Sequence, residues 1–101
     1  MKIKDIYYDT DHIQGCPTCD YGSKYITDFE IIYEDNHTLK FIINADNGKL
    51  LSEGELMCIL ANTTNENEIK EAIINKCKHK MFDSHNYYSS SLYINDEEIK
   101  L

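Results

Sequence analysis

Two neighbouring segments of alternating hydrophobicity constrain this chain more than any other feature of its sequence. In residues 25–33 the odd positions are aromatic, apolar or threonine, whereas Asp28 and Glu30 stand at even positions. Residues 39–45 continue the pattern with apolar side chains at every odd position. A period of two is typical of β-strands that bury one face. The two segments therefore predict an antiparallel hairpin with one apolar face.

The register of this hairpin follows from the length of its loop. A two-residue turn would pair Ile31 with Lys40 and mix the two faces, whereas a three-residue loop over residues 35–37 keeps the apolar side chains together. The pairs that this loop predicts are Tyr33 with Leu39, Ile31 with Phe41 and Phe29 with Ile43. Either Asn36 or His37 then takes the left-handed conformation.

The rest of the chain predicts further strands and two helices. A short strand is expected over residues 3–8, with residues 9–12 as a turn. Ser52 and Glu55 form a capping-box pattern before one helix, and Ile69, Ile73 and Cys77 form an apolar stripe on a second helix that starts near Asn65. Two short strands then flank a turn at residues 95–96, with Leu92 opposite Ile99. The predicted fold is α+β, a single domain over residues 1–101 with an antiparallel sheet (β-β-β-α-α-β-β) and two helices on one face.

Charge limits the classes of partner. The formal net charge is -8, and all ten basic residues are lysines. Arg is the usual residue for bidentate contacts to phosphate and guanine, so a direct nucleic-acid partner and an anionic membrane are not expected. A protein with a basic surface is the expected partner. The sequence has no apolar run long enough to span a membrane and no apolar segment typical of secretion, which predicts a cytoplasmic protein.

The candidate partner-binding site is the non-core face of the hairpin. Alternation puts Asp28, Glu30 and Glu34 on that face, and we expect Tyr21 and Tyr25 at its edge. Exposed tyrosines are enriched at interfaces because they bury much area at low entropic cost. The alternative interpretation is a solvated face that only keeps the protein soluble. The surplus of tyrosines on a half-exposed sheet also leads us to expect a C2 homodimer.

The Cys16–Cys19 pair, in a C-x-x-C spacing, permits three interpretations. A thioredoxin-like redox pair would need a helix after the first cysteine, and Gly22 interrupts the segment. A zinc knuckle would need two more ligands, and no spacing selects among the remaining His and Cys residues, namely His12, Cys58, Cys77, His79 and His85. The third interpretation is a tight structural turn. We expect no cofactor, with zinc held by Cys16, Cys19 and His12 as the alternative. Cys77 is expected to be a buried thiol and Cys58 an exposed one.

Residues 15–23, with the sequence GCPTCDYGS, resemble a small uncharacterised family from phages and mobile elements of A-T-rich Gram-positive bacteria. The family has no established activity, so the resemblance implies a context and no catalytic residue. No hydrolase triad, phosphate loop or dinucleotide fingerprint is present in the sequence. The sequence therefore favours a non-enzymatic, intracellular protein-binding module. The resemblance implies that its partner is a host protein with a basic surface and that the module inhibits a bacterial defence protein, as the anti-CRISPR proteins do. Two alternatives stay open: a zinc- or thiol-dependent regulatory module using Cys16 and Cys19, and a sponge for a small signalling nucleotide.

Overall fold

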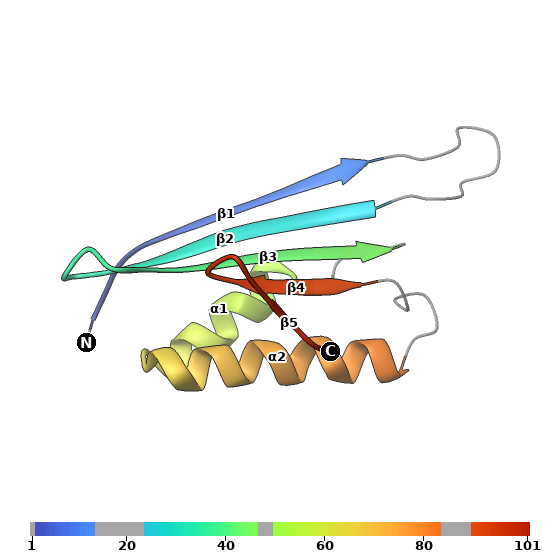
Figure 1. Cartoon of the computed structure of the whole chain (residues 1–101). Helices are drawn as coiled ribbons and strands as arrows, with labels where there is room; N and C mark the ends of the chain where they lie inside the picture. The colour runs from blue at the N-terminus through green and yellow to red at the C-terminus, as the bar shows by residue number, and fades with distance from the viewer. Residues whose placement is uncertain (1, 14–23, 47–49, 84–89) are drawn as a thin grey trace.

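The computed structural model describes residues 2–13, 24–46, 50–83 and 90–101 of the 101-residue chain. Its elements, in chain order, are β1 (Ile3–Ile13), β2 (Lys24–Tyr33), β3 (Thr38–Asp46), α1 (Glu53–Asn62), α2 (Glu66–Asp83), β4 (Ser91–Ile94) and β5 (Glu97–Ile99). The strands form one antiparallel sheet whose spatial order, β1-β2-β3-β4-β5, follows the chain. Both helices lie on one face of this sheet (Figure 1). The predicted α+β class and element order are confirmed.

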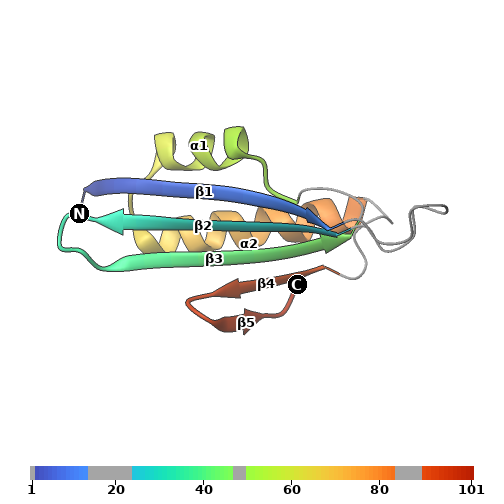
Figure 2. The ribbon, with the colours of Figure 1, turned by 90° about the horizontal axis from the view of Figure 1, so that it is seen from above.

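The hydrophobic core fills the space between the sheet and the helices. The odd-numbered residues 29–33 of β2 and 39–45 of β3 are buried, as the alternation predicts. They pack with Leu56 of α1 and with Ile69, Ile73 and Cys77 of α2. Figure 2 looks onto the opposite face of the sheet, with α2 behind β2 and β3 and α1 on the side of β1. Neither helix covers that face.

The β2–β3 loop has the predicted length but starts one residue earlier. The Asn36 N–H donates to the Tyr33 carbonyl, and the Tyr33 N–H donates to the His37 carbonyl. Asn36 takes a φ of 71°, so the loop is a turn closed by a left-handed residue. Because the loop starts at Glu34 and not at residue 35, the predicted partners are wrong by two positions, although every side chain stays on its predicted face. The observed pairs are Phe29 with Phe41 and Ile31 with Leu39.

Strand β1 is longer than its sequence predicts. Residues 9–12, expected to form a turn, continue the strand and pair with residues 25–28 of β2. Asp is rare in strands, which is why the two aspartates, Asp9 and Asp11, indicated a turn. The long neighbouring strand β2 supplies hydrogen-bonding partners along its whole length, and this tertiary pairing outweighs the local preference.

The helix ends and the final turn follow from local chemistry. Ser52 and Glu55 complete the capping box of α1, with each side chain bonded to the backbone N–H of the other. The Asn65 side chain accepts a hydrogen bond from the Glu68 N–H at the start of α2. Asn95 and Asp96 both adopt positive φ angles, as a two-residue hairpin turn requires. Leu92 pairs with Ile99, which confirms the predicted register of the last hairpin.

Candidate functional site

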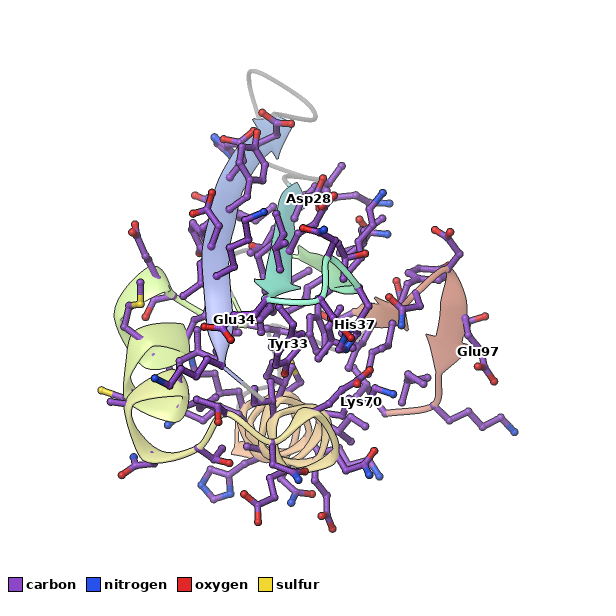
Figure 3. The ribbon with its side chains drawn as sticks, turned by 90° about the vertical axis from the view of Figure 1, so that its left-hand side faces the viewer. Asp28, Tyr33, Glu34, His37, Lys70 and Glu97 are labelled. Atoms are coloured by element: carbon purple, nitrogen blue, oxygen red, sulfur yellow. The ribbon has the colours of Figure 1, made fainter. Side chains whose placement is uncertain are left out.

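The sheet face away from the helices, called the open face below, gathers most of the acidic side chains of the strands. Register and alternation assign its residues. They are Asp5, Tyr7, Asp9, Asp11, Lys24, Ile26, Asp28, Glu30, Ile32, Thr38, Lys40, Ile42, Asn44, Ser91, Tyr93 and Glu98. Figure 3 shows Asp28 on this side of β2, away from α2. Carboxylates outnumber lysines on the open face, so its potential is negative.

One cross-strand row runs over all five strands. Asp9 of β1 lies opposite Asp28 of β2, which lies opposite Ile42 of β3, followed by Tyr93 of β4 and Glu98 of β5. The row therefore has acidic ends and an apolar and aromatic middle. Such a combination, apolar contact area bordered by one sign of charge, is suited to a protein partner of opposite charge.

Asp28 occupies an electrostatically unfavourable position in the row. Its neighbour across the strand pair is another carboxylate, Asp9, and like charges placed directly opposite each other destabilise a sheet. One carboxylate oxygen of Asp28, Oδ1, is buried and has no hydrogen-bond partner among the described residues. A cation or donor supplied from outside the chain would relieve both costs.

The other predicted site residues are distributed more widely than expected. Glu30 lies on the open face between Tyr7 and Lys40, so its charge has an opposite charge beside it. Glu34 belongs to the β2–β3 loop and is exposed there, at the end of the hairpin (Figure 3). Tyr25 lies on the helix side of β2, where its ring stacks on His12 at a centroid distance of 4.4 Å. Tyr21 lies outside the described residues.

Sequence reasoning missed Asp9 and Asp11, because it placed them in a turn. The structure puts both on the open face, where Asp9 pairs with Asp28 and Asp11 with Ile26. The missed signal was the two-residue period of β1, in which Asp5, Tyr7, Asp9 and Asp11 alternate with Ile6, Tyr8, Thr10 and His12. Tyr7 is an exposed large hydrophobic side chain, with 55% of its surface accessible.

A second polar cluster surrounds His37. Its Nδ1 contacts Asp35 in the same loop, and its Nε2 lies 3.1 Å from Oε2 of Glu66 on α2. The ring also stacks on Tyr33, at a centroid distance of 4.5 Å. Because the two carboxylates bind opposite ring nitrogens, they cannot share one metal ion with the imidazole. The cluster is a bridge between the hairpin loop and α2.

Electrostatics support the same view of the His37 cluster. The hydrogen bond to Asp35 is the main cause that raises the pKa of His37, and it outweighs the effect of partial burial. Hydrogen bonds from His37 lower the pKa of Asp35. Burial, followed by the charge of Glu66, raises the pKa of Tyr33. The raised pKa of His37 means that folding favours the protonated imidazole between the two carboxylates more than the unfolded chain does.

The cysteines give no chemical centre within the described residues. Cys77 is fully buried in the core, and burial raises its pKa to about 12, so the thiol stays protonated. Cys58 is exposed on α1. Both of these placements confirm the sequence predictions. Cys16 and Cys19 lie outside the described residues, as does the resembling segment as a whole. His12, their proposed companion, is exposed at the end of β1 and stacks on Tyr25.

No group of three or more His, Cys, Asp or Glu side chains that could hold a metal ion occurs in residues 2–13, 24–46, 50–83 and 90–101. None of the described helices is long and apolar enough to cross a membrane. Comparison of the chain with known proteins gave no match to a family model, to a curated protein or to a solved structure.

Proposed function

We propose that this protein is a non-enzymatic binding module whose open face docks on a basic surface of a partner protein. The observation that carries the proposal is the row from Asp9 to Glu98, in which carboxylates border an apolar and aromatic centre on a sheet face that neither helix covers. Such a row costs stability in the free protein, because Asp9 and Asp28 repel each other. A basic partner would offset that cost on binding.

The expected partner is a protein of a bacterial host, and the expected effect is inhibition of a defence system, as by anti-CRISPR proteins. The acidic net charge of -8 supports this proposal, because many defence proteins must bind nucleic acid and therefore present basic surfaces. The resemblance of residues 15–23 to phage and mobile-element proteins supports the same context. Attraction between the charges would chiefly speed association, and burial of Tyr7 and Tyr93 would slow release.

The proposal is tested with a matched pair of triple variants. The site variant carries Asp9→Asn, Asp28→Asn and Glu30→Gln on the open face. The control variant carries Glu53→Gln, Glu71→Gln and Glu97→Gln at exposed positions outside it. Both variants remove the same number of negative charges, so a difference in binding between them reports the open face and not the net charge of the protein.

Two measurements use this pair. Quantitative pull-downs from a lysate of an A-T-rich Gram-positive bacterium should recover a specific basic protein with wild type and control but not with the site variant. Plating of a phage on a strain whose defence targets it should improve when wild type or control is expressed, and not with the site variant. Equal recovery and equal plating with both variants would contradict the open face as the site. Turnover of a small substrate by the purified protein would contradict the non-enzymatic function.

A further inference from the structure

We propose that the outer edge of β1 accepts an antiparallel strand from the partner, with Lys or Arg at alternate positions of that strand. This inference rests on the proposed function and specifies how the partner is held. The sheet would grow from five strands to six, and backbone hydrogen bonds would provide contacts that the open face alone lacks.

The direction of the β1 backbone groups follows from the β2–β3 loop. The N–H and C=O of Tyr33 both bond within the loop toward β3, so those of the next residue, Ile32, point toward β1. Alternation continues along both strands, and it directs the backbone groups of Ile6, Tyr8, Thr10 and His12 away from β2. These residues form the outer edge of the sheet.

One hydrogen bond agrees with this assignment and shows which part of the edge is available for pairing. The Ile6 N–H donates to the side-chain Oδ1 of Asp5 at 2.8 Å, as expected for a donor that has no strand beside it. The Asp5 side chain thus provides an acceptor for the outward-pointing N–H at the N-terminal end of the edge. Tyr8, Thr10 and His12 remain as the available part, and no other strand pairs with them in the described part of the chain.

The two edges of the sheet differ in their protection. Strand β5 is three residues long and carries Glu97 and Glu98, and both shortness and charge discourage strand addition. Strand β1 is eleven residues long, with a register irregularity only between Ile3 and Asp5. The aspartates of β1 discourage pairing with most strands, but its length still makes this edge a template for an added strand of opposite charge.

The charges of β1 determine which side chains the added strand should carry. Asp9 and Asp11 alternate with the outward-facing residues and carry their side chains on the open face. An antiparallel strand paired through Tyr8, Thr10 and His12 places its own open-face residues opposite Asp9 and Asp11. Such pairs are of the non-hydrogen-bonded kind, whose side chains come closest together. Lys or Arg at these alternate positions would form cross-strand ion pairs.

A second copy of this chain fits the edge poorly. A two-fold axis at Tyr8 would place Asp5 opposite Asp11, and an axis at Thr10 would place Asp9 opposite Asp11. An axis between these, at Asp9, would set two copies of Asp9 against each other. Each arrangement sets like charges directly opposite, which destabilises the pair. A basic strand from another protein avoids the repulsion of these three arrangements, and it is the occupant that we propose.

The probe for this proposal is a short synthetic peptide in which Lys alternates with Val or Thr. In the antiparallel register above, the Lys residues lie opposite Asp9 and Asp11 and direct their N–H groups away from β1. The alternate Val and Thr residues direct theirs toward Tyr8, Thr10 and His12. N-methylation of the Val and Thr residues should thus abolish binding, whereas N-methylation of the Lys residues should leave it within about twofold.

Variants of the protein provide the second arm. Thr10→Pro removes an outward N–H without removing a bond to β2, and we expect it to weaken peptide binding about tenfold. Thr10→Val is its matched control. Asp9→Asn with Asp11→Asn leaves the edge intact, and it should weaken binding and flatten its salt dependence. Amide chemical shifts in the NMR spectrum should change at Tyr8, Thr10 and His12.

Several results would overturn the proposal. They are the absence of binding, equal binding of a scrambled peptide, insensitivity to N-methylation at the Val and Thr positions, and shift changes confined to residues around Asp28 and Glu30. A dimer mass for the free protein that Thr10→Pro converts to a monomer would assign the edge to a second copy and would also overturn it. None of these results decides whether a partner docks on the open face, because the pull-down with the two triple variants tests that proposal independently.

Discussion

His37 and Glu66 connect the β2–β3 loop to the first turn of α2 through a contact of 3.1 Å between His37 Nε2 and Glu66 Oε2. The same imidazole contacts Asp35 through Nδ1 and stacks on Tyr33. Loop, strand and helix thus meet at one titratable ring.

This arrangement makes stability depend on pH. The pKa of His37 is raised in the folded protein, so its stabilising effect is fully present below the unfolded pKa of about 6.5 and is lost as the pH rises through the folded value. His37→Gln should therefore lower the melting temperature more at about pH 5.5 than at about pH 9. Thermal melts at both pH values measure this difference. His12→Gln serves as the control, and an equal loss for His37→Gln at both pH values would contradict the prediction.

Glu55 joins the two helices and caps one of them. It completes the capping box with Ser52, bonds to Lys80 and lies 3.6 Å from Lys76. Burial raises the pKa of Glu55, but the hydrogen bonds from Lys80 and Ser52 outweigh it, so the net shift is downward. The stabilising effect is thus present above about pH 4.5 and is lost as the pH falls through the lowered value.

Two substitutions separate these roles of Glu55. Glu55→Gln keeps an acceptor for the Ser52 N–H but loses the ion pairs, and it should cost less than about 1 kcal/mol of unfolding free energy, a loss that high salt removes. Glu55→Ala should cost more, by about 0.5–1 kcal/mol, because the cap is lost as well. Urea unfolding at low and high salt checks both values. Equal costs for the two variants would mean that the cap contributes nothing.

Thr27 is a buried residue whose hydroxyl has no hydrogen-bond partner in the described part of the chain. Its cross-strand neighbour, Thr10, also has a buried hydroxyl without a hydrogen-bond partner among the described residues. Thr27→Val keeps the shape and removes the desolvated oxygen, so we expect it to stabilise the fold by about 1 kcal/mol. Denaturant midpoints measure the gain, with the exposed Thr38→Val as control. A loss of stability would show that the Thr27 hydroxyl has a partner.

The two described cysteines should react at very different rates. Cys58 is exposed, whereas the Cys77 thiol is buried and has a pKa of about 12. A maleimide should therefore label Cys58 in the native protein and label Cys77 only after unfolding, because the thiolate is the reactive form. Peptide mapping by mass spectrometry locates the label. Rapid native labelling of Cys77 would contradict its place in the core.

Much of this fold is predictable because its signals are local. The period of two in β2 and β3, the pattern of Ser52 and Glu55, and the turn at residues 95–96 each specify their element without help from distant residues. The failures have nonlocal causes. The second half of β1 is a strand only because β2 lies beside it, and the exact partners of Phe29 depend on which residue begins the loop.

The candidate site was predictable only in part, for the same reason. Alternation alone puts Asp28 and Glu30 on the open face, but the neighbours of Asp28, namely Asp9 and Ile42, follow from the register of three strands. The bridge from His37 to Glu66 joins residues that are far apart in the sequence, and no local pattern indicates it. A site made by pairing is visible only when the pairing is known.

The chain order of the sheet also determines how the protein folds. Neighbouring strands are joined in sequence, so the β2–β3 and β4–β5 hairpins can each form on the microsecond timescale. The exception is the contact between β3 and β4, in which Phe41 pairs with Ile94 across both helices. Closing this long loop costs the most chain entropy, so we expect it to form last, after α2 has collapsed onto the three-stranded part. The slow step in refolding is therefore the pairing of β3 with β4, which joins the three-stranded part of the sheet to the β4–β5 hairpin.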